Sequence, residues 1–190
     1  MTRRTTGVSA DVFPEVLAAA RLGQPWALDA LFRGYASAVA GYVRGRTSAE
    51  ADDIVSEVFL SVFTSLERFS GGEADFRGWL FTIAQRRIVD DLRRRSRRVE
   101  TTDYDAETDG REVGSAELAS LDRLGEQWVR RVLGQLAPDQ RDVLLLRILG
   151  DLSLEQVAQA LGKSEGAVKQ LQRRGLLAAG RIVQAEGVPL

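Results

Sequence analysis

The sequence predicts an all-α protein made of two small helical domains joined by a flexible acidic linker. Apolar residues recur at helical spacing along most of the chain, and no segment shows the alternation of a half-buried strand. A charged stretch without apolar periodicity separates the two blocks of helical pattern. With 190 residues, 44% of them hydrophobic, the chain is long enough to bury packed cores.

Charge is distributed unevenly along the chain, although the net charge is only −1. Residues 1–98 hold 15 basic and 12 acidic groups, residues 99–122 hold 1 and 8, and residues 123–190 hold 10 and 7. Two basic blocks therefore flank an acidic connector, so the near-neutral total is a poor guide to the partners of the protein.

Composition excludes several kinds of site. Without cysteine there is neither a disulfide framework nor a thiolate site, and without histidine there is no zinc site of the usual kind and no His-based triad. We therefore expect no cofactor, no metal and no small-molecule substrate. The first residues lack the apolar core of a signal peptide, and the longest strongly apolar run is Val143–Leu146. We expect a cytoplasmic protein without membrane insertion.

The first domain is predicted over residues 11–98, after a disordered tail of residues 1–10. A short helix is expected over Asp11–Leu22, ended by Gly23, and two long amphipathic helices follow. Thr47 and Glu50 form a capping box that would start the second of these. The predicted core faces are Leu28, Leu31, Phe32, Tyr35, Val39, Tyr42 and Val43 in one, and Ile54, Val55, Val58, Phe59, Val62, Phe63 and Leu66 in the other.

The opposite side of the second long helix carries an acidic surface that includes one leucine. Its members are Asp52, Asp53, Ser56, Glu57 and Leu60. Acids near a helix N-terminus offset the helix dipole, so the pattern is typical of an ordinary solvated face. Charge alone leaves open whether this surface has a partner.

A glycine-containing loop over residues 68–75 precedes a third long helix that ends in an arginine-rich run. The core face of this helix is predicted to hold Phe76, Leu80, Ile83, Ala84, Ile88 and Leu92. Its seven arginines are typical of a polyanion-binding surface: Arg86, Arg87, Arg93, Arg94, Arg95, Arg97 and Arg98. Trp79 and Thr82 lie on the same side as Arg86, where the indole ring either stacks on unpaired bases or belongs to the core.

The acidic linker is predicted over residues 99–120, and the second domain over residues 121–190. The linker could reach about 75 Å when fully extended. A helical stripe of Leu121, Leu124, Trp128, Val132 and Leu136 opens the second domain. Pro138 then starts an apolar helix, and Gly175 and Gly180 are expected to weaken the last helix, which frays toward Leu190.

Residues 153–174 have the pattern of a DNA-binding helix-turn-helix. Ser153 with Gln156 forms a capping box, Gly162 is suited to the left-handed conformation that ends a helix, and Ser164 can cap the helix that follows. Side chains suited to groove and phosphate contacts lie away from the apolar face: Ser164, Glu165, Lys169, Gln170, Arg173 and Arg174. An ordinary helical hairpin with a charged face is the alternative.

Three blocks in this order resemble a bacterial RNA polymerase sigma factor of the extracytoplasmic-function (ECF) group. The blocks read AEADDIVSEVFLSVF, then RFSGGEADFRGWLFTIAQRRIVDDLRRR, then LAPDQRDVLLLRILGDLSLEQVAQALGKSEGAVKQLQRR. The resemblance implies that the first domain is sigma region 2 and the second is region 4. It also implies that core RNA polymerase (clamp and flap), promoter DNA and an anti-sigma factor are partners.

The resemblance assigns roles to the surfaces described above. It places Asp52, Asp53, Ser56, Glu57 and Leu60 on the polymerase clamp, and Ser164, Glu165, Lys169, Gln170, Arg173 and Arg174 on the duplex minus-35 element. It places the following residues on the melted minus-10 strand: Ser70, Gly71, Gly72, Asp75, Phe76, Trp79, Thr82, Arg86, Arg87 and Arg93. The acidic linker would thread the polymerase cleft. Many members have asparagine where Arg86 stands and an arginine-rich tail where this chain has LQRRGLLAAG.

Two other functions are compatible with parts of the pattern. A one-component regulator would bind an operator through the helix-turn-helix without being a polymerase subunit. A magnesium-dependent helical enzyme would use Asp52, Asp53 and Glu57 as ligands, but the sequence offers no second set of carboxylates for such a centre.

Overall fold

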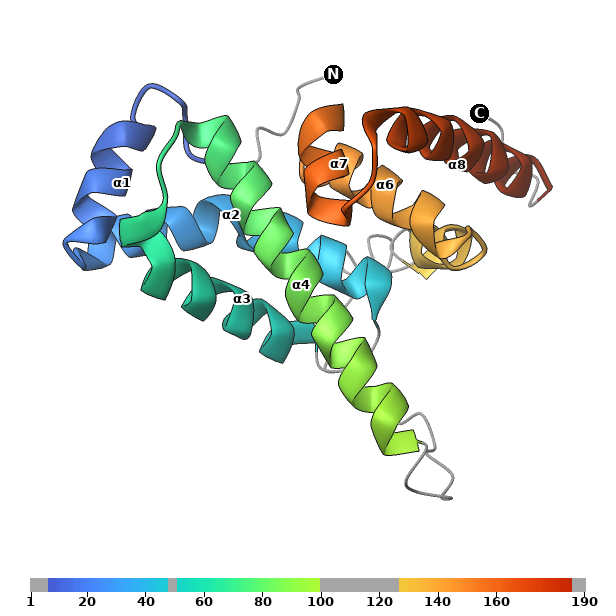
Figure 1. The fold of residues 1–190 in the computed structure, drawn as a ribbon, viewed down its shortest axis with the longest axis horizontal. Helices are drawn as coiled ribbons and strands as arrows, with labels where there is room; N and C mark the ends of the chain where they lie inside the picture. Colours follow the sequence, from blue (N-terminus) through green and yellow to red (C-terminus); the bar gives the residue numbers. More distant parts are fainter. Residues whose placement is uncertain (1–6, 48–50, 100–126, 186–190) are drawn as a thin grey trace, which may run out of the picture.

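The structure is a computed structural model that describes residues 7–47, 51–99 and 127–185. Every regular element among these residues is helical, as expected. The helices are α1 (Phe13–Arg21), α2 (Pro25–Arg46), α3 (Ala51–Ser65), the 3₁₀ turn η1 (Leu66–Arg68), α4 (Glu73–Val99), α6 (Pro138–Ile148), α7 (Leu154–Leu161) and α8 (Glu165–Ala185). Residues 127–134 are also helical. We call α1–α4 the N-terminal lobe and residues 127–185 the C-terminal lobe (Figure 1).

The core of the N-terminal lobe lies between α2, α3 and α4. Helix α2 contributes the centre of this core, because Leu31, Tyr35, Val39, Tyr42 and Val43 are fully buried along one face. The face predicted for α3 is buried from Ile54 to Val62. Helical periodicity therefore identified most of the core of this lobe.

Aromatic packing connects the start of α4 with α1, α2 and the segment that follows η1. Phe76 at the start of α4 is fully buried and packs against Phe13, Tyr35 and Phe69 with ring centroids 5.2–5.5 Å apart. Arg21 donates to the carbonyl oxygens of Leu66 and Phe69 from the end of α1. These contacts hold the chain between η1 and α4 in place.

The start signals of the C-terminal lobe act as predicted. Pro138 occupies the first turn of α6, and the Ser153–Gln156 capping box is formed in both directions. Gly162 has φ 63°, and the backbone N–H of Ala167 donates to the Ser164 hydroxyl at 3.2 Å. Helices α7 and α8 thus form the predicted helix-turn-helix, supported by α6.

Some expectations differ from the structure, and others fall outside the described residues. Residues 7–10 lie against the N-terminal lobe, where Val8 packs on its core, instead of joining a disordered tail. Helix α8 is continuous through Gly175 and Gly180; Gly175 is buried because Leu144 approaches its backbone closely. The pattern predicts Phe32 and Leu92 in the core, but they are 42% and 39% exposed. The Thr47–Glu50 box, most of the 99–120 linker and the Leu121–Leu124 part of the stripe lie outside the described residues.

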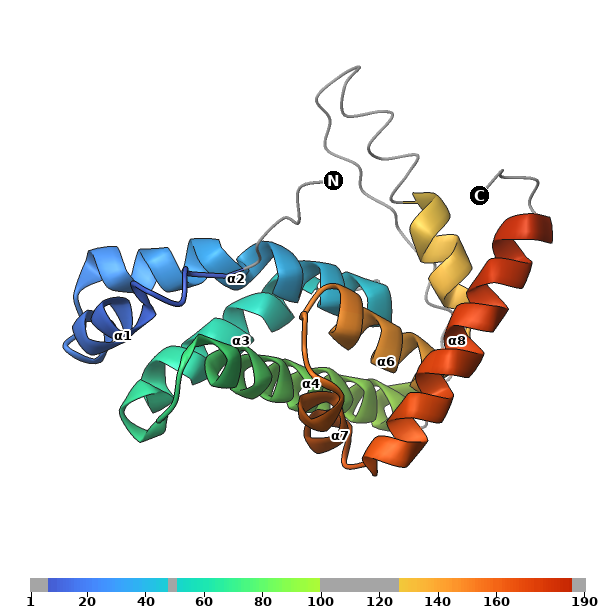
Figure 2. The same ribbon diagram turned by 90° about the horizontal axis from the view of Figure 1, so that it is seen from above.

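The two lobes are packed together instead of standing apart. Helix α6 contacts α2 and helix α7 lies across α4 (Figure 2). Phe81 shows the consequence: it lies off the predicted core face of α4, yet it is fully buried and lies beside Gly150 of the C-terminal lobe. One continuous set of buried side chains runs through both lobes.

Gly162 offers a test of the turn between α7 and α8. Gly162→Ala should lower the free energy of unfolding by about 1–2 kcal/mol, because an L side chain resists the left-handed conformation. Apart from the adjoining residues of the chain, no atom lies within 4 Å of the added methyl group, so the loss would be conformational. Gly180→Ala is the control, because it also meets no neighbour but lies within a helix, where alanine is favoured. Urea denaturation of both variants measures the difference, and equal stabilities would contradict this account of the turn.

Candidate nucleic-acid and protein interfaces

The acidic surface lies on the outer side of α3, opposite its buried face. Asp52, Asp53 and Ser56 are exposed, Glu57 is half-buried, and Leu60 is 65% exposed. The helix dipole accounts for Asp52 and Asp53 in the first turn, but not for Glu57 or for a leucine left in water. An apolar side chain bordered by acids suits contact with a basic protein partner.

Two charged groups of the acidic surface have partners within the chain. Asp52 pairs with Arg44 at 2.9 Å, where both side chains are well exposed. The carboxylate of Glu57 lies 3.9 Å from the guanidinium groups of both Arg87 and Arg94. Such long or exposed pairs contribute little to stability, so they leave the acids available to a partner.

The loop before α4 is shaped by Asp75 and two glycines. The backbone N–H of Gly72 donates to Asp75 Oδ2 at 2.9 Å, which closes the first turn of α4. Gly71 has φ 139°, and a Cβ placed there would lie 2.7 Å from the side chain of Asp75. Asp75 and Gly71 therefore fix the loop, which leaves Ser70 exposed at its outer side.

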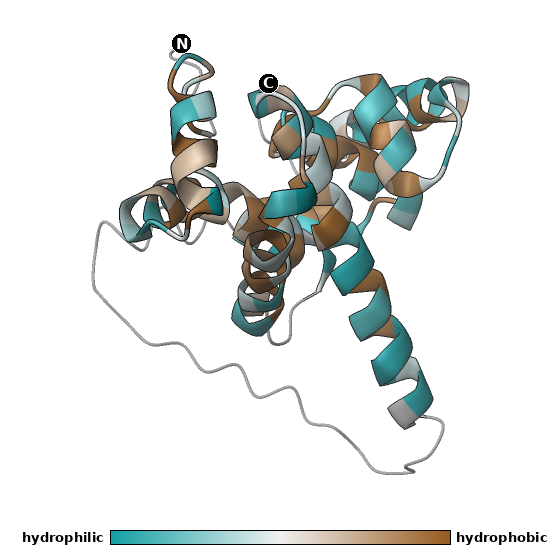
Figure 3. Cartoon of the chain, turned by 60° about the vertical axis from the view of Figure 1, so that its left-hand side comes forward, coloured by the Kyte–Doolittle hydropathy of each residue, from teal (hydrophilic) through white to brown (hydrophobic). Residues whose placement is uncertain are grey.

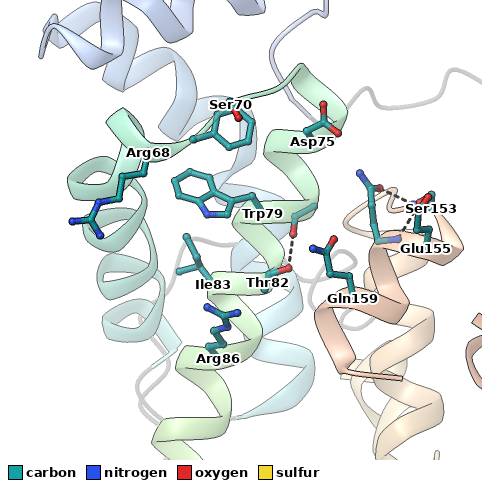
Figure 4. A pocket seen from close by; sticks show the side chains of 13 residues that line it. Arg68, Ser70, Asp75, Trp79, Thr82, Ile83, Arg86, Ser153, Glu155 and Gln159 are labelled. Atoms are coloured by element: carbon teal, nitrogen blue, oxygen red, sulfur yellow. Dashed lines mark hydrogen bonds between the residues drawn. The ribbon is translucent and has the colours of Figure 1, made fainter. Parts of the chain in front are cut away.

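Trp79 and Arg86 line a cavity of about 520 Å³ beside this loop, which we call the strand pocket (Figure 4). One face of the Trp79 ring stacks on Phe69 at 5.1 Å, yet the side chain is only half-buried. Arg86 is exposed farther along the same side of α4, beyond Thr82. Trp79 thus combines both interpretations of the sequence: it is packed on the core and also accessible.

The complete lining of the strand pocket comes from both lobes. It consists of Arg68, Phe69, Ser70, Asp75, Gly78, Trp79, Thr82, Ile83 and Arg86 from the N-terminal lobe, and Ser153, Glu155, Gln156 and Gln159 from the C-terminal lobe. Eight of these residues were not among the predicted strand contacts: Arg68, Phe69, Gly78, Ile83 and the four C-terminal residues. The capping box marked Ser153 and Gln156 as helix-start residues but carried no signal of a second contact.

Five residues assigned to the strand do not line the pocket. Gly71 and Gly72 belong to the loop beside it. Phe76 is fully buried, so it supports the pocket from within the core. Arg87 points to α3 and donates to the Ser61 hydroxyl at 2.7 Å. Arg93 lies farther along α4, 4.0 Å from Asp90.

The last turns of α4 project beyond the bundle (Figure 1) and are mainly hydrophilic (Figure 3). The buried carboxylate of Asp91 binds Arg95 at 2.7 Å and lies 3.8 Å from Arg94. Part of the arginine charge is therefore balanced within the helix, so Arg86 beside the pocket is a more specific candidate than the run as a whole.

Helix α8 presents a continuous polar surface to solvent, which we call the recognition face. Val168 is buried and Leu171 is half-buried on the opposite side of the helix. All predicted members of the recognition face are exposed: Ser164, Glu165, Lys169, Gln170, Arg173 and Arg174. The sequence did not predict that Leu176 and Leu177 would be more than half exposed next to this face.

The part of the chain that the structure describes has neither a candidate metal site nor a candidate membrane-spanning helix. Its acidic side chains nowhere form a group of three that could hold a metal ion. None of its helices is both long and apolar enough to cross a membrane.

Family models match both lobes. The model for "Sigma-70 region 2" matches residues 31–98, and the model for "Sigma-70, region 4" matches residues 126–178. The acidic surface and the N-terminal-lobe residues of the strand pocket thus lie in the first matched segment, and the recognition face and the α7 side of the pocket lie in the second.

Curated relatives and a solved structure agree with these matches. The chain is 31% identical over 172 residues to the ECF RNA polymerase sigma factor BldN of Streptomyces coelicolor, which covers 89% of this chain and 65% of BldN. It therefore spans slightly less than two thirds of BldN. It is 32% identical over 157 residues to the RNA polymerase sigma factor CarQ of Myxococcus xanthus, covering 82% of this chain and 88% of CarQ.

The fold is shared with CnrH, whose structure was solved in complex with the cytosolic domain of CnrY. The TM-score is 0.66 at 24% identity, over 92% of this chain and 99% of CnrH. This similarity concerns the fold alone. The two family models and the curated relatives show that the chain belongs to the ECF group of RNA polymerase sigma factors.

Proposed function

We propose that this protein is a non-catalytic initiation factor that binds core RNA polymerase and directs it to promoters. The observation that carries the proposal is that one chain has two different surfaces whose side chains suit nucleic acid. The strand pocket offers an aromatic ring beside an exposed arginine, which suits an unpaired base next to a phosphate. The recognition face offers the second helix of a helix-turn-helix, which suits the major groove of a duplex.

The strand pocket is proposed to hold the melted minus-10 element. Trp79 would stack on a base that has left the duplex, and Arg86 would neutralise the backbone beside it. Ser70 and the loop fixed by Gly71, Gly72 and Asp75 would line the opening. Phe76 would act from the core by supporting Trp79, and Thr82 would lie between the ring and Arg86. Arg87 and Arg93 are proposed to contribute only to the general positive field.

The recognition face is proposed to bind the duplex minus-35 element. Lys169 and Arg173 are one helical turn apart on the exposed side of α8. Gln170 and Glu165 could pair with base edges. Ser164, just before α8, and Arg174, farther along the helix, suit contacts with the DNA backbone.

The acidic surface of α3 is proposed to dock on the clamp of the polymerase, and the C-terminal lobe on its flap. Leu60 would be covered in this complex, which removes the exposed apolar side chain from water. We also propose an anti-sigma factor as a regulatory partner; the complex of CnrH with the cytosolic domain of CnrY supports a protein partner for this fold. The protein would then act in the cytoplasm.

Reconstitution with purified core polymerase tests this function. The chain should bind core polymerase in a pull-down, and the complex should produce discrete run-off transcripts from genomic fragments on which core polymerase alone produces none. Sequence-specific operator binding by the chain without polymerase binding would instead support a one-component regulator.

Charge reversal on α3 should abolish polymerase binding. The double variant Asp53→Arg/Glu57→Arg replaces two acids of the interface while leaving the buried face of α3 unchanged. Its helical circular dichroism and unfolding midpoint should stay close to those of the parent, because substitutions on an exposed face have small effects on stability. Glu67→Arg on η1 is the control, since it is an exposed acid outside the acidic surface. An unfolded double variant would show that the acids are structural.

The two nucleic-acid surfaces should fail differently. Lys169→Ala or Arg173→Ala should weaken promoter binding on duplex and on pre-melted templates alike, by roughly 1–3 kcal/mol wherever the removed side chain binds a base edge. Trp79→Ala or Arg86→Ala should impair opening of duplex promoters, while a pre-melted bubble should largely restore transcription because it already supplies the unstacking energy.

Permanganate footprinting of unpaired thymines, run beside transcription on both templates, distinguishes these defects. Arg181→Ala removes an exposed cation of α8 beyond the recognition face and should change neither readout. If the Trp79→Ala variant opens duplex promoters normally, the ring serves packing on Phe69 and the opening function belongs to the loop.

A further inference from the structure

Two arginines of the N-terminal lobe have neither an ion pair nor a hydrogen-bond acceptor for their side chains among the described residues. They are Arg68 on η1 and Arg86 on α4, and both side chains are exposed. Both also line the strand pocket, so the arginine charge that this lobe leaves unpaired is gathered at one cavity. The other arginines whose side chains the structure describes in this lobe all have a partner within the chain: Arg21, Arg33, Arg44, Arg46, Arg77, Arg87, Arg93, Arg94, Arg95 and Arg97.

The backbone of Arg68 is held in place, although its side chain has no partner. Arg68 is the last residue of η1, and the next residue, Phe69, is buried. Arg21 donates to the carbonyl oxygen of Phe69, and the Phe69 ring stacks on Trp79 with ring centroids 5.1 Å apart. The packing that orients Trp79 therefore also fixes the point from which the Arg68 side chain extends into solvent.

Arg86 lies beside the same ring, but on a different element. Trp79 and Arg86 are about two turns apart on α4, which is about 10 Å along the helix axis. Figure 4 shows Arg68 to one side of the Trp79 ring and Arg86 beyond the ring along α4. Two cations thus flank the surface on which a base would stack.

The pocket also contains two carboxylates, which lie away from Arg68. Asp75 comes from the first turn of α4 and Glu155 from α7. In Figure 4 both lie on the other side of Trp79 from Arg68. Carboxylates repel phosphate, whereas guanidinium groups attract it and match its geometry. This distribution of charge favours a strand whose phosphates run along the side of Arg68 and Arg86.

We propose that Arg68 is a second phosphate-binding residue of the strand pocket, so that Arg68 and Arg86 hold the backbone on the two sides of the base that stacks on Trp79. This inference deepens the proposed function and rests on it, because it takes the ligand of the pocket to be an unpaired strand. Phosphate contacts fix the register of a nucleic acid without reading its sequence. Arg68 thus sets which nucleotide of the strand meets the ring.

The salt dependence of binding counts these contacts. Each phosphate of a single strand that a protein neutralises adds about 0.7 to the slope of log affinity against log salt concentration. Arg68→Ala and Arg86→Ala should each reduce the slope by about 0.7, and the double variant by about 1.4, because fewer counterions are released. Arg68→Lys keeps the charge and should keep the slope of the parent.

The slope is measured with the full chain bound to core polymerase, on a fluorescent promoter fragment whose minus-10 region is pre-melted. A parallel series uses the full chain alone with a short single-stranded oligonucleotide of mixed sequence. Arg33→Ala is the control and should keep the slope, because it removes an exposed arginine of α2 that pairs with Asp29 outside the pocket. The unfolding midpoint of Arg68→Ala should equal that of the parent, since this side chain is exposed.

The outcomes separate this inference from the proposed function. An unchanged slope for Arg68→Ala beside a reduced slope for Arg86→Ala would overturn the inference and leave the proposed function intact. The same loss of slope in Arg68→Lys as in Arg68→Ala, with a lower unfolding midpoint, would show a structural role instead. A chain that does not bind core polymerase would refute the proposed function, and the oligonucleotide series would then decide the phosphate contact. No binding in that series would overturn the inference as well.

Discussion

The ion pair between Arg46 and Asp142 is the constraint on which the arrangement of the lobes depends. Neither charge is stable in an apolar interior without the other, and each is supplied by a different lobe. Tyr42 is fully buried on the same helix as Arg46, and burial together with the nearby carboxylate of Asp142 raises the pKa of its phenol. A buried polar contact adds less net stability than apolar packing of the same area, but it accepts few alternative geometries. It is thus suited to select one docked orientation of the lobes.

Helix α4 connects this constraint with the proposed function. Its core side packs against α2 and α3, its outer side carries Trp79 and Arg86, and Phe81 between them is covered by the C-terminal lobe. One helix is thus shared by the core, the strand pocket and the contact between the lobes.

Local patterns predicted the parts of this structure that depend on local physics. The spacing of Leu31, Tyr35 and Val39 indicated a buried helix face, and Ser153, Gln156 and Gly162 specified where α7 begins and ends. The contacts between lobes could not be predicted in this way. In the sequence, Arg46 and Asp142 each look like a solvated charge of an ordinary helix. Neither helical pattern indicates that the two side chains form a pair. The burial of Phe81 and Gly175 was not predicted for the same reason, because residues of another element cause it. Within the candidate site, residue type and spacing identified Trp79 and Arg86, whereas the α7 wall of the pocket depends on the tertiary arrangement.

Cryo-electron microscopy of the full chain bound to core polymerase on a promoter fragment with a melted minus-10 region tests the central claim most directly. The account predicts that the acidic surface of α3 lies on the polymerase and that a base lies against Trp79. A complex in which α3 faces solvent, or in which the strand is held away from Trp79, would contradict it.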